Sequence, residues 1–379
     1  MAEAASSPDE LIQAVDQKIT AVRTQSIDFS FNELADMYES EELIIDPEFQ
    51  RMFRWTEGAQ ARFIESLLLE LPVPPIFLIE RDDRVYELID GLQRISSFLH
   101  FRGELEVDGE KLPPLVLSDC DIVPELNGRT HANLPRALGI KLKRSYIRAE
   151  ILRKESDPRL RYYMFKRLNT GGEELSKQEV RNATIRLLSN DFNQYIIELS
   201  RNSDFMFCSE TLTENARREK FDQELVLRFF AFKNAGSTYR HDIADFLTDY
   251  MEDISDPSST SQFDYAHERH IFEKTFKVIR GIGETIDIGP RVMGTVSRTG
   301  DPRWQFSVYH YEGIVLGIQK VIDRLDPADP FQMERVAAVV KTGKSDPDFL
   351  RATGGGKNDR NSLRARISYF ADRFSGALD

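Results

Sequence analysis

The stretch from Thr56 to Phe101 places the narrowest limits on what this chain can fold into. The segment "TEGAQARFIESLLLEL" (56–71) spaces its apolar residues as a helix does, and "PVPP" ends it. "PIFLIE" (75–80) and "VYELID" (85–90) are apolar runs on either side of "RDDR", which predicts a hairpin or two neighbouring strands. A helix over 92–101 follows directly. Two helices and two strands must therefore pack together within this short stretch.

The remainder of the chain divides into a mixed front half and a helical back half. "SIDFSFNELADMY" predicts a strand and then a helix capped near Ser30, and "YIRAEILR" (146–153) alternates as a strand does. Residues 103–135 are rich in Pro, Gly and Asp and predict irregular structure. Beyond them we expect helices near 157–168, 176–188, 190–201, 221–234, 241–254, 262–282, 306–325, 328–342 and 358–375. The expected class is α+β, with an acidic helical leader (1–25), a mixed α/β domain (26–187) and an all-helical domain (188–379).

Composition indicates a cytoplasmic protein. Among the 379 residues, Cys120 and Cys208 are the two cysteines and lie in unrelated contexts, which argues against a disulfide framework or a zinc site. No apolar run approaches the length of a membrane span. The net charge of −13 disfavours a protein coated in nucleic acid, but residues 136–154 carry seven bases and one acid. This basic stretch, with Lys141, Lys143 and Arg144, fits either a solvated face or a weak nucleic-acid contact.

The junction "YELIDGLQR" is the first candidate site. A helix start presents unpaired N–H groups and the positive end of the helix dipole, so it suits an anion. Gly91 permits close backbone approach, and Arg94 can offer a planar fork of donors to a phosphate. Asp90 fits if it holds Mg²⁺ or positions a water or a ribose hydroxyl. The alternative is that Asp90 caps the helix and Arg94 forms a surface ion pair.

Two further stretches carry polar residues in suggestive settings. In "DPEFQRMFRW" (46–55), Gln50, Arg51 and Arg54 alternate with aromatic residues, a pattern that binds phosphates and stacks on bases, or that belongs to a surface strand. In "MFKRLNTGGEELSKQEVRNA" (164–183), Ser176 and Glu179 predict a capping box. A helix corner explains its glycines, but it leaves Asn169 and Arg181 free to face a pocket.

Other motifs are weak or missing. "AVVKTGKS" (338–345) loosely matches a phosphate-binding loop, but its flanks are helical and it lacks the internal glycine. "HERH" (267–270) places two histidines at i, i+3 with no third ligand in view. We find no histidine nuclease motif, no acidic pair followed by Glu-x-Lys on a strand and no Gly-x-Ser-x-Gly elbow.

Taken in order, "PEFQRMFRW", "LPVPPIFLIE", "YELIDGLQR" and "FKRLNTGGEELSKQEVRNA" resemble the N-terminal domain of the GmrSD-type modification-dependent restriction enzymes. That resemblance implies a fold similar to the ParB/sulfiredoxin superfamily, in which a Gly-x-x-Arg turn at a helix start binds nucleotide phosphate. It would make Asp90, Gly91, Gln93 and Arg94 the nucleotide turn. Gln50 and Arg51 would line the same pocket, and Asn169 and Arg181 would reach it from the helical corner.

The sequence departs from the family pattern at Leu92, which replaces the first Gln of the usual DGQQR. This change removes a hydrogen-bonding side chain, so nucleotide binding is a safer expectation than hydrolysis. The histidine nuclease domain that often follows in the family is also missing from the chain. We therefore expect a sensor or regulatory subunit that works with a partner nuclease.

The resemblance implies an NTP-binding module of a modified-DNA, anti-phage defence system, with NTP hydrolysis as the further expectation. Its cofactors would be ATP, GTP or CTP with Mg²⁺, and Asp90 and Gln93 would take the catalytic roles. The first alternative is a non-catalytic DNA- or protein-binding module with a vestigial nucleotide turn. The second is a nuclease whose acids lie far apart in the sequence. The residues do not distinguish between oligomeric states.

Overall fold

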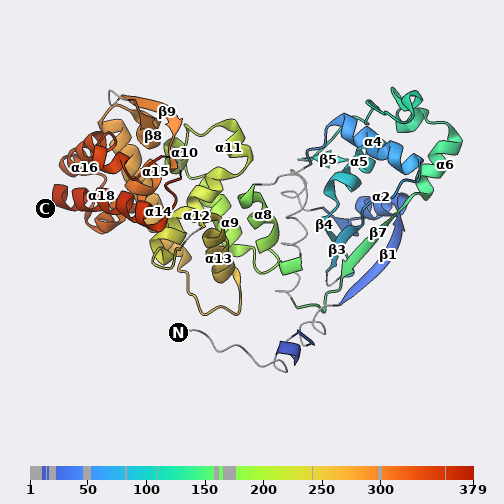
Figure 1. Cartoon of the computed structure of the whole chain (residues 1–379), viewed down its shortest axis with the longest axis horizontal. Coiled ribbons are helices and arrows are strands. Elements are labelled where there is room, and N and C mark those ends of the chain that lie inside the picture. The colour runs from blue at the N-terminus through green and yellow to red at the C-terminus, as the bar shows by residue number, and fades with distance from the viewer. Residues whose placement is uncertain are drawn as a thin grey trace. The chain divides into compact units, whose positions relative to one another are not determined.

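The computed structural model describes residues 11–13, 15–16, 23–45, 53–81, 83–107, 109–157, 162–164, 176–240, 242–297, 301–354 and 356–379. The chain forms two compact units, Met1–Glu173 and Glu174–Asp379 (Figure 1). Among the predicted site residues, Gln50, Arg51 and Asn169 lie outside the described residues. Much of the predicted leader and of the helix expected over 157–168 also lies outside them.

A five-stranded mixed sheet is the framework of the first unit. Its order is β1 (Thr24–Ser30), β7 (Tyr146–Leu152), β3 (Ile76–Glu80), β4 (Tyr86–Asp90) and β2 (Leu43–Ile44). Strand β7 runs antiparallel to β1 and parallel to β3, and β4 runs antiparallel to β3 and parallel to β2. The predicted neighbouring strands β3 and β4 thus form an antiparallel pair at the centre of the unit.

The helices described beside this sheet are α2 (Phe31–Glu39), α4 (Glu57–Leu68), α5 (Leu92–Arg102) and α6 (Arg136–Arg144). Helices α2, α4 and α5 pack together against the sheet (Figure 1). Their shared core contains Phe31, whose ring lies 5.9 Å from that of Phe63 and 5.0 Å from that of Phe98. The predicted cap of α2 is confirmed, since the Ser30 side chain accepts from the Glu33 amide. Two short strands, β5 (Glu106–Val107) and β6 (Glu110–Lys111), and two 3₁₀ turns, η1 (Pro124–Leu126) and η2 (His131–Asn133), complete the unit.

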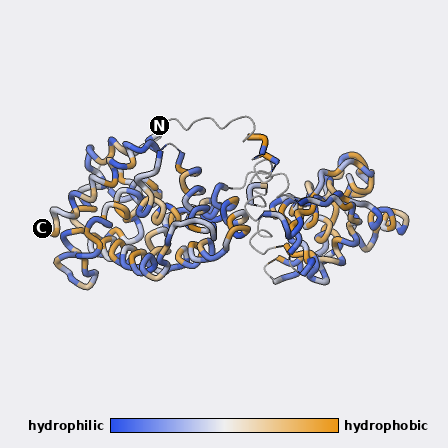
Figure 2. Tube along the Cα trace, turned by 90° about the horizontal axis from the view of Figure 1, so that it is seen from below, coloured by the Kyte–Doolittle hydropathy of each residue, from blue (hydrophilic) through white to orange (hydrophobic). Residues whose placement is uncertain are grey.

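The second unit is mainly helical. Its α-helices are α8 (Lys177–Ile185), α9 (Asp191–Ser200), α10 (Ser203–Cys208), α11 (Glu214–Arg218), α12 (Phe221–Ala235), α13 (Ile243–Ser255), α14 (Tyr265–Thr285), α15 (Val308–Tyr311), α16 (Pro330–Gly343), α17 (Pro347–Leu350) and α18 (Arg360–Leu378). Hydrophobic and hydrophilic residues alternate along both units (Figure 2), as amphipathic elements around separate cores require. The predicted capping box at Ser176 and Glu179 is present at the start of α8.

A chain of buried ion pairs connects distant helices of this unit. Glu224 binds Arg181 at 2.6 Å and Arg228 at 2.9 Å. Glu312 then binds Arg228 at 2.9 Å and Arg366 at 2.6 Å. Arg366 is fully buried and Glu312 is 1% exposed. The network therefore joins α8, α12 and α18 through charges that have little access to water.

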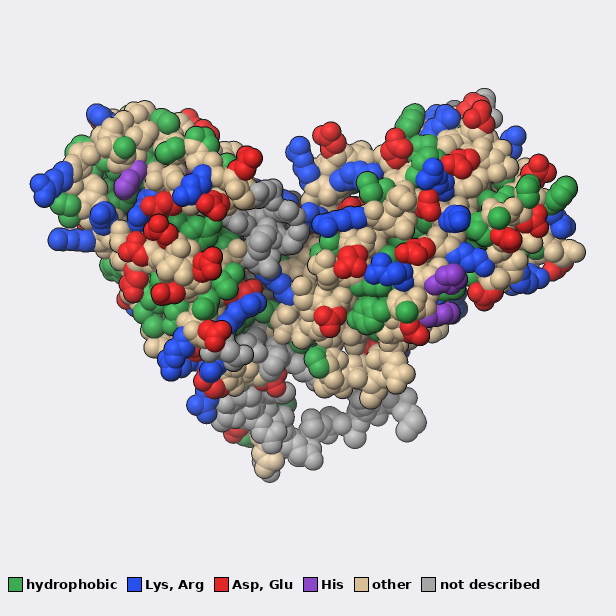
Figure 3. All heavy atoms as spheres, turned by 180° about the vertical axis from the view of Figure 1, so that it is seen from behind, with side chains coloured by type: hydrophobic (Ala, Val, Ile, Leu, Met, Phe, Trp, Pro, Cys, Tyr) green, Lys and Arg blue, Asp and Glu red, His purple; other side chains and the backbone are tan. Residues whose placement is uncertain are grey.

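The expected α+β class and the helical back half are confirmed, with specific errors. The back half also contains a hairpin of β8 (Gly294–Val296) and β9 (Pro302–Phe306), which follows the 3₁₀ turn η3 (Gly289–Met293). Helix α6 was not predicted; only Leu142 of its residues is buried, and no side chain of its N-cap residue, Pro135, accepts a hydrogen bond at its start. On the face seen from behind, acidic and basic side chains are interspersed over both units (Figure 3).

The prediction of one helix over 306–325 is wrong. Helix α15 passes into a π-helical turn, η4 (Glu312–Leu316), and then into the 3₁₀ turns η5 (Ile318–Lys320) and η6 (Ile322–Arg324). Gly313 and Gly317 lie close against α18, where a Cβ added at Gly317 would be 2.7 Å from the Phe370 Cβ. Apolar periodicity does not register such a change of helical type, because the apolar residues stay on one face.

Candidate functional site

The turn between β4 and α5 has a backbone that only glycine adopts comfortably. Gly91 has φ +105°, in the left-handed region. A Cβ at this position would lie 2.3 Å from Ile76 Cγ2 on the neighbouring strand. Gly91 is also the N-cap of α5, and no side chain caps that helix start. The Asp90 carboxylate binds Arg94 instead of capping the helix, and among the described residues no side-chain oxygen caps this helix start.

Arg94 holds two segments together from the first turn of α5. Its Nη2 donates to Asp90 Oδ2 at 2.8 Å, and its Nη1 donates to the Pro74 carbonyl at 3.2 Å. The Arg94 side chain is 14% exposed and that of Asp90 is 36% exposed. The ion pair with Asp90 agrees with the simpler alternative, although Arg94 is more buried than a surface pair implies. An arginine has five N–H donors, so this guanidinium keeps further donors for an anion.

Gln93 connects the helix start to the "FRW" segment. Its Oε1 accepts from the backbone amides of Arg54 and Trp55, each at 3.0 Å. Gln93 was predicted to act in catalysis, and the structure gives its carbonyl oxygen a positioning role. Because of these two bonds, the exposed residue Arg54 is held close to the start of α5.

A series of hydrogen bonds that the sequence did not predict holds the "FRW" segment against α4 and α5. The Trp55 carbonyl accepts from Gln60 Nε2 at 2.8 Å, and Gln60 Oε1 lies 2.7 Å from His100 Nδ1. The other ring nitrogen of His100 contacts the Pro113 carbonyl at 2.9 Å, and burial lowers the pKa of His100. Gln60 lies four residues after the Thr56 cap and His100 lies in the third turn of α5. In the sequence, the signal for this network was a polar residue among the apolar residues of each of two predicted helices.

Leu92 is buried, with 5% of its surface exposed. The expectation that Leu92 removes a hydrogen-bonding side chain from beside a phosphate assumed that position 92 faces the ligand. In the structure this side chain belongs to the core of the first unit. The replacement therefore bears on packing more directly than on hydrolysis.

Arg181 lies in the second unit, with 3% of its surface exposed. Its guanidinium binds Glu224 Oε2 at 2.6 Å and Gln178 Oε1 at 2.9 Å. Nη1 also reaches the Ala244 carbonyl at 3.3 Å. These contacts give Arg181 a role in the packing of α8 against α12 and α13.

The donors at the junction fit a magnesium ion only when it arrives with phosphates. Within the described part of the chain, no group of three or more His, Cys, Asp or Glu residues is placed to hold a metal ion. Asp90 supplies a single carboxylate, and Mg²⁺ in nucleotide sites is commonly held by one or two carboxylates together with phosphate oxygens. Asp90 therefore suits a nucleotide-bound Mg²⁺ rather than a metal site formed by the protein alone.

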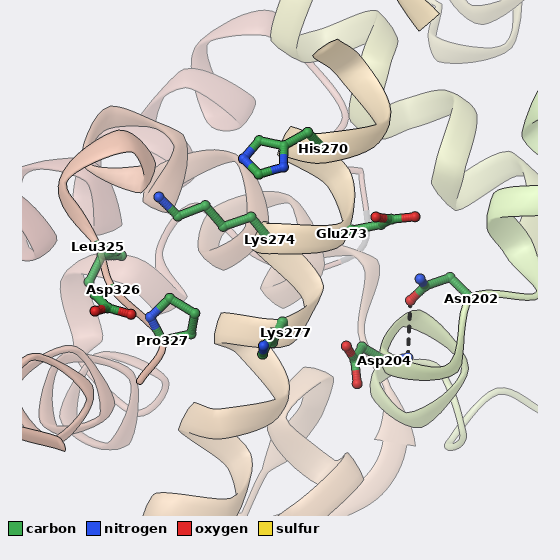
Figure 4. Close-up of a pocket in the computed structure, with 9 residues that line it drawn as sticks. All are labelled: Asn202, Asp204, His270, Glu273, Lys274, Lys277, Leu325, Asp326 and Pro327. Atoms are coloured by element: carbon green, nitrogen blue, oxygen red, sulfur yellow. Dashed lines mark hydrogen bonds between the residues drawn. The ribbon is translucent and has the colours of Figure 1, made fainter. Parts of the chain in front are cut away.

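Two hollows lie elsewhere in the molecule. One, of about 910 Å³, lies in the first unit beside α6 and includes Lys141 and Arg144 in its lining, whereas Lys143 is exposed on the same helix. The other, of about 570 Å³, lies in the second unit around His270, Lys274 and Lys277 of α14 (Figure 4). Asp204, Glu273 and Asp326 also line this second hollow, so its acidic and basic side chains are mixed and favour no ligand of one sign.

The first unit thus defines a class of domain: a mixed sheet with helices, in which a glycine turn leads to an uncapped helix start that carries an arginine. Residues 31–186 match the family model described as the GmrSD restriction endonuclease, N-terminal domain. The match supports the family that the four ordered motifs indicated, and it suggests a component of a restriction system.

Comparisons with curated proteins and with solved structures gave no match. None of the helices in the described part of the chain combines the length and the apolar character that a membrane crossing needs.

Proposed function

We propose that the chain binds a nucleoside triphosphate at the β4–α5 junction and serves as a sensor or regulatory component of a restriction system. The observation that carries the proposal is the uncapped start of α5 at Gly91, with Arg94 in the first helical turn. The amides of that turn and the helix dipole attract an anion, and the planar guanidinium adds directional donors. The family match supports the restriction context.

Each residue at the junction has a separate part in this proposal. The Gly91 backbone lets phosphate oxygens approach the helix start, and Arg94 donates to them while Pro74 and Asp90 keep its guanidinium in place. The Asp90 carboxylate coordinates the Mg²⁺ that accompanies the phosphates. Gln93 keeps Arg54 close by, where a second positive charge can neutralise the phosphate tail.

Titration calorimetry of the full chain with ATP, GTP and CTP, with and without Mg²⁺, tests the proposal. We expect one nucleotide to bind, and Arg94→Ala to weaken it about tenfold or more, the value of a charge-assisted hydrogen bond. Asp90→Ala should abolish the gain from Mg²⁺ and weaken metal-free binding less than Arg94→Ala does, because the Pro74 carbonyl still holds Arg94. Release of inorganic phosphate measures whether the bound nucleotide is hydrolysed.

Arg81→Ala is the matched control. Arg81 binds the buried carboxylate of Glu87 at 2.6 Å in the same unit, so its loss removes a comparable pair away from the helix start. If Arg81→Ala and Arg94→Ala weaken binding equally, the effect is one of folding and the site is misplaced. If no nucleotide binds wild type at all, the non-catalytic binding module becomes the better account.

A further inference from the structure

Three segments of different chemistry line the groove beside α6. Leu71, Pro72, Val73 and Pro75 of the α4–β3 loop form an apolar wall, residues of α6 form a second, and the start of β7 contributes Tyr146 and Arg148. Its volume is about 910 Å³. The base of the groove is fixed, because Ser145 Oγ donates to the Leu67 carbonyl at 3.3 Å and the Ser145 carbonyl accepts from the Phe31 amide at 2.9 Å.

Large apolar side chains line this groove and remain open to solvent. Leu71 is 42% exposed and Ile140, on the facing wall, is 41% exposed. Tyr146 is 68% exposed, whereas the next residue, Ile147, is 1% exposed and points to the other face of the sheet. The groove therefore presents an aromatic face at one end of an apolar trough.

The charged residues of the groove leave one cation unpaired. Arg148 Nε binds Asp28 at 3.0 Å across the β1–β7 pair. Lys141 binds Glu70 at 3.2 Å, which connects α6 to the loop. Arg144 is exposed, and within the described residues no acidic side chain forms an ion pair with it. Lys143 is its exposed neighbour on α6.

We infer that this groove is a second binding site, separate from the β4–α5 junction, and that it takes a single strand of nucleic acid. A base stacks on Tyr146 and rests in the apolar trough, while the adjoining phosphates lie on Arg144 and Lys143. Two features point to this occupant together. An exposed aromatic ring next to unpaired basic side chains is the usual chemistry of strand binding without sequence preference. Within 136–154, Lys141, Arg148 and Arg153 form ion pairs with acidic side chains, and the exposed cations Arg144 and Lys143 complement a phosphate backbone.

Other occupants fit less well. An apolar peptide would use the trough but would leave Arg144 and Lys143 without partners. Duplex nucleic acid would satisfy the cations, but its stacked bases would not reach the Tyr146 face. The single strand uses all three features.

Fluorescence anisotropy of the full chain with a labelled oligothymidylate of about 12 nucleotides, within the usual size of strand-binding sites, tests the inference. We expect Tyr146→Ala to weaken binding about tenfold or more and Tyr146→Phe to keep it, since stacking needs the ring alone. Arg144→Ala should lower the slope of log affinity against log salt by about 0.7. Trp304→Ala, which removes a 57% exposed aromatic residue of the second unit, is the aromatic control. Arg129→Ala, exposed in the first unit and outside the groove lining, is the charge control.

Three outcomes would overturn the inference. The first is equal affinity for the oligonucleotide in wild type and Tyr146→Ala. The second is tighter binding of the duplex than of the strand. The third is equal competition by dextran sulfate, which would show attraction by charge alone. Tyr146→Ala should leave nucleotide binding in place, and oligonucleotide binding by Arg94→Ala should still depend on Tyr146, so the two proposals fail separately.

Discussion

Glu312→Gln is expected to destabilise the second unit and leave the first unchanged. Glu312 is 1% exposed and its two carboxylate oxygens bind Arg228 and Arg366 separately. Glutamine keeps the shape but removes the charge and replaces one acceptor oxygen by a donor. Removing one member of a buried ion pair typically costs about 3–5 kcal/mol, because the remaining charge stays buried without compensation. We expect a loss of about 3 kcal/mol, which lowers Tm by about 6–12 °C for a unit of this size.

The two cysteines allow each unit to be followed separately. Cys120 lies in the first unit and Cys208 in the second, and both thiols are buried. Burial raises the pKa of Cys120 to about 11 and also raises that of Cys208, so neither thiol reacts readily in the folded chain near neutral pH. Pulsed alkylation along a temperature or urea series, read by mass spectrometry, therefore reports the unfolding of each unit.

The surface pair of Arg324 and Asp379 supplies the control. Their side chains are 53% and 67% exposed. Arg324→Ala should change the Cys208 midpoint little, as exposed pairs are worth about 0–1 kcal/mol. If Glu312→Gln moves the Cys208 midpoint no further than this control, the buried network does not stabilise the unit. An equal change at Cys120 would contradict the assignment of the effect to one unit.

Three further outcomes are expected. Gly91→Ala should destabilise the first unit by more than Gly128→Ala, measured at Cys120, since both glycines have positive φ but only Gly91 has a neighbour within the space of a Cβ. The pKa of Lys344 is lowered by burial to about 7, so the unfolded state binds more protons above that pH and stability should rise with pH from about 7 to 9. In urea titrations this rise is up to about 1.4 kcal/mol per pH unit, and it should vanish in Lys344→Met. Saturating nucleotide should change oligonucleotide affinity, because Arg94 binds Pro74 and the neighbouring residues Val73 and Pro75 line the groove; an unchanged affinity would show that the sites are independent.

Those elements of the first unit that could be predicted have clear local signals. The apolar run of "YELID" and the alternation of "YIRAEIL" mark strands, and Ser30 and Thr56 mark helix starts, where their side chains accept amide protons. Helix α6 has no such side-chain cap at its start. The π-helical turn at Glu312 lies where Gly313 and Gly317 approach α18, which is remote in the sequence, so local periodicity does not register it.

The roles of polar residues were harder to predict than the elements. Arg181 resembled a ligand-binding residue because it stands in a distinctive motif, yet its guanidinium is paired with Glu224 across a large sequence separation. Gln93 likewise serves the backbone of Arg54 and Trp55. A motif indicates that a side chain has a role. Whether that role is in packing or in ligand binding depends on which hydrogen-bond donor or acceptor, distant in the sequence, the fold places beside it.

The β4–α5 turn shows how packing and binding can reside in the same residues. Gly91 is required by Ile76, Gln93 holds the "FRW" segment, and Arg94 holds the "PVPP" loop, so three of the four ordered motifs meet at one helical turn. Such convergence would maintain the motif even without a ligand. The uncapped helix start and the remaining donors of Arg94 take no part in packing. Arg94→Lys separates the ligand-binding role of Arg94 from its packing role, because a lysine can keep one hydrogen bond and the charge but loses the planar fork of donors. If nucleotide affinity falls while the Cys120 midpoint holds, the turn serves a ligand; if both fall together, packing alone accounts for the motif.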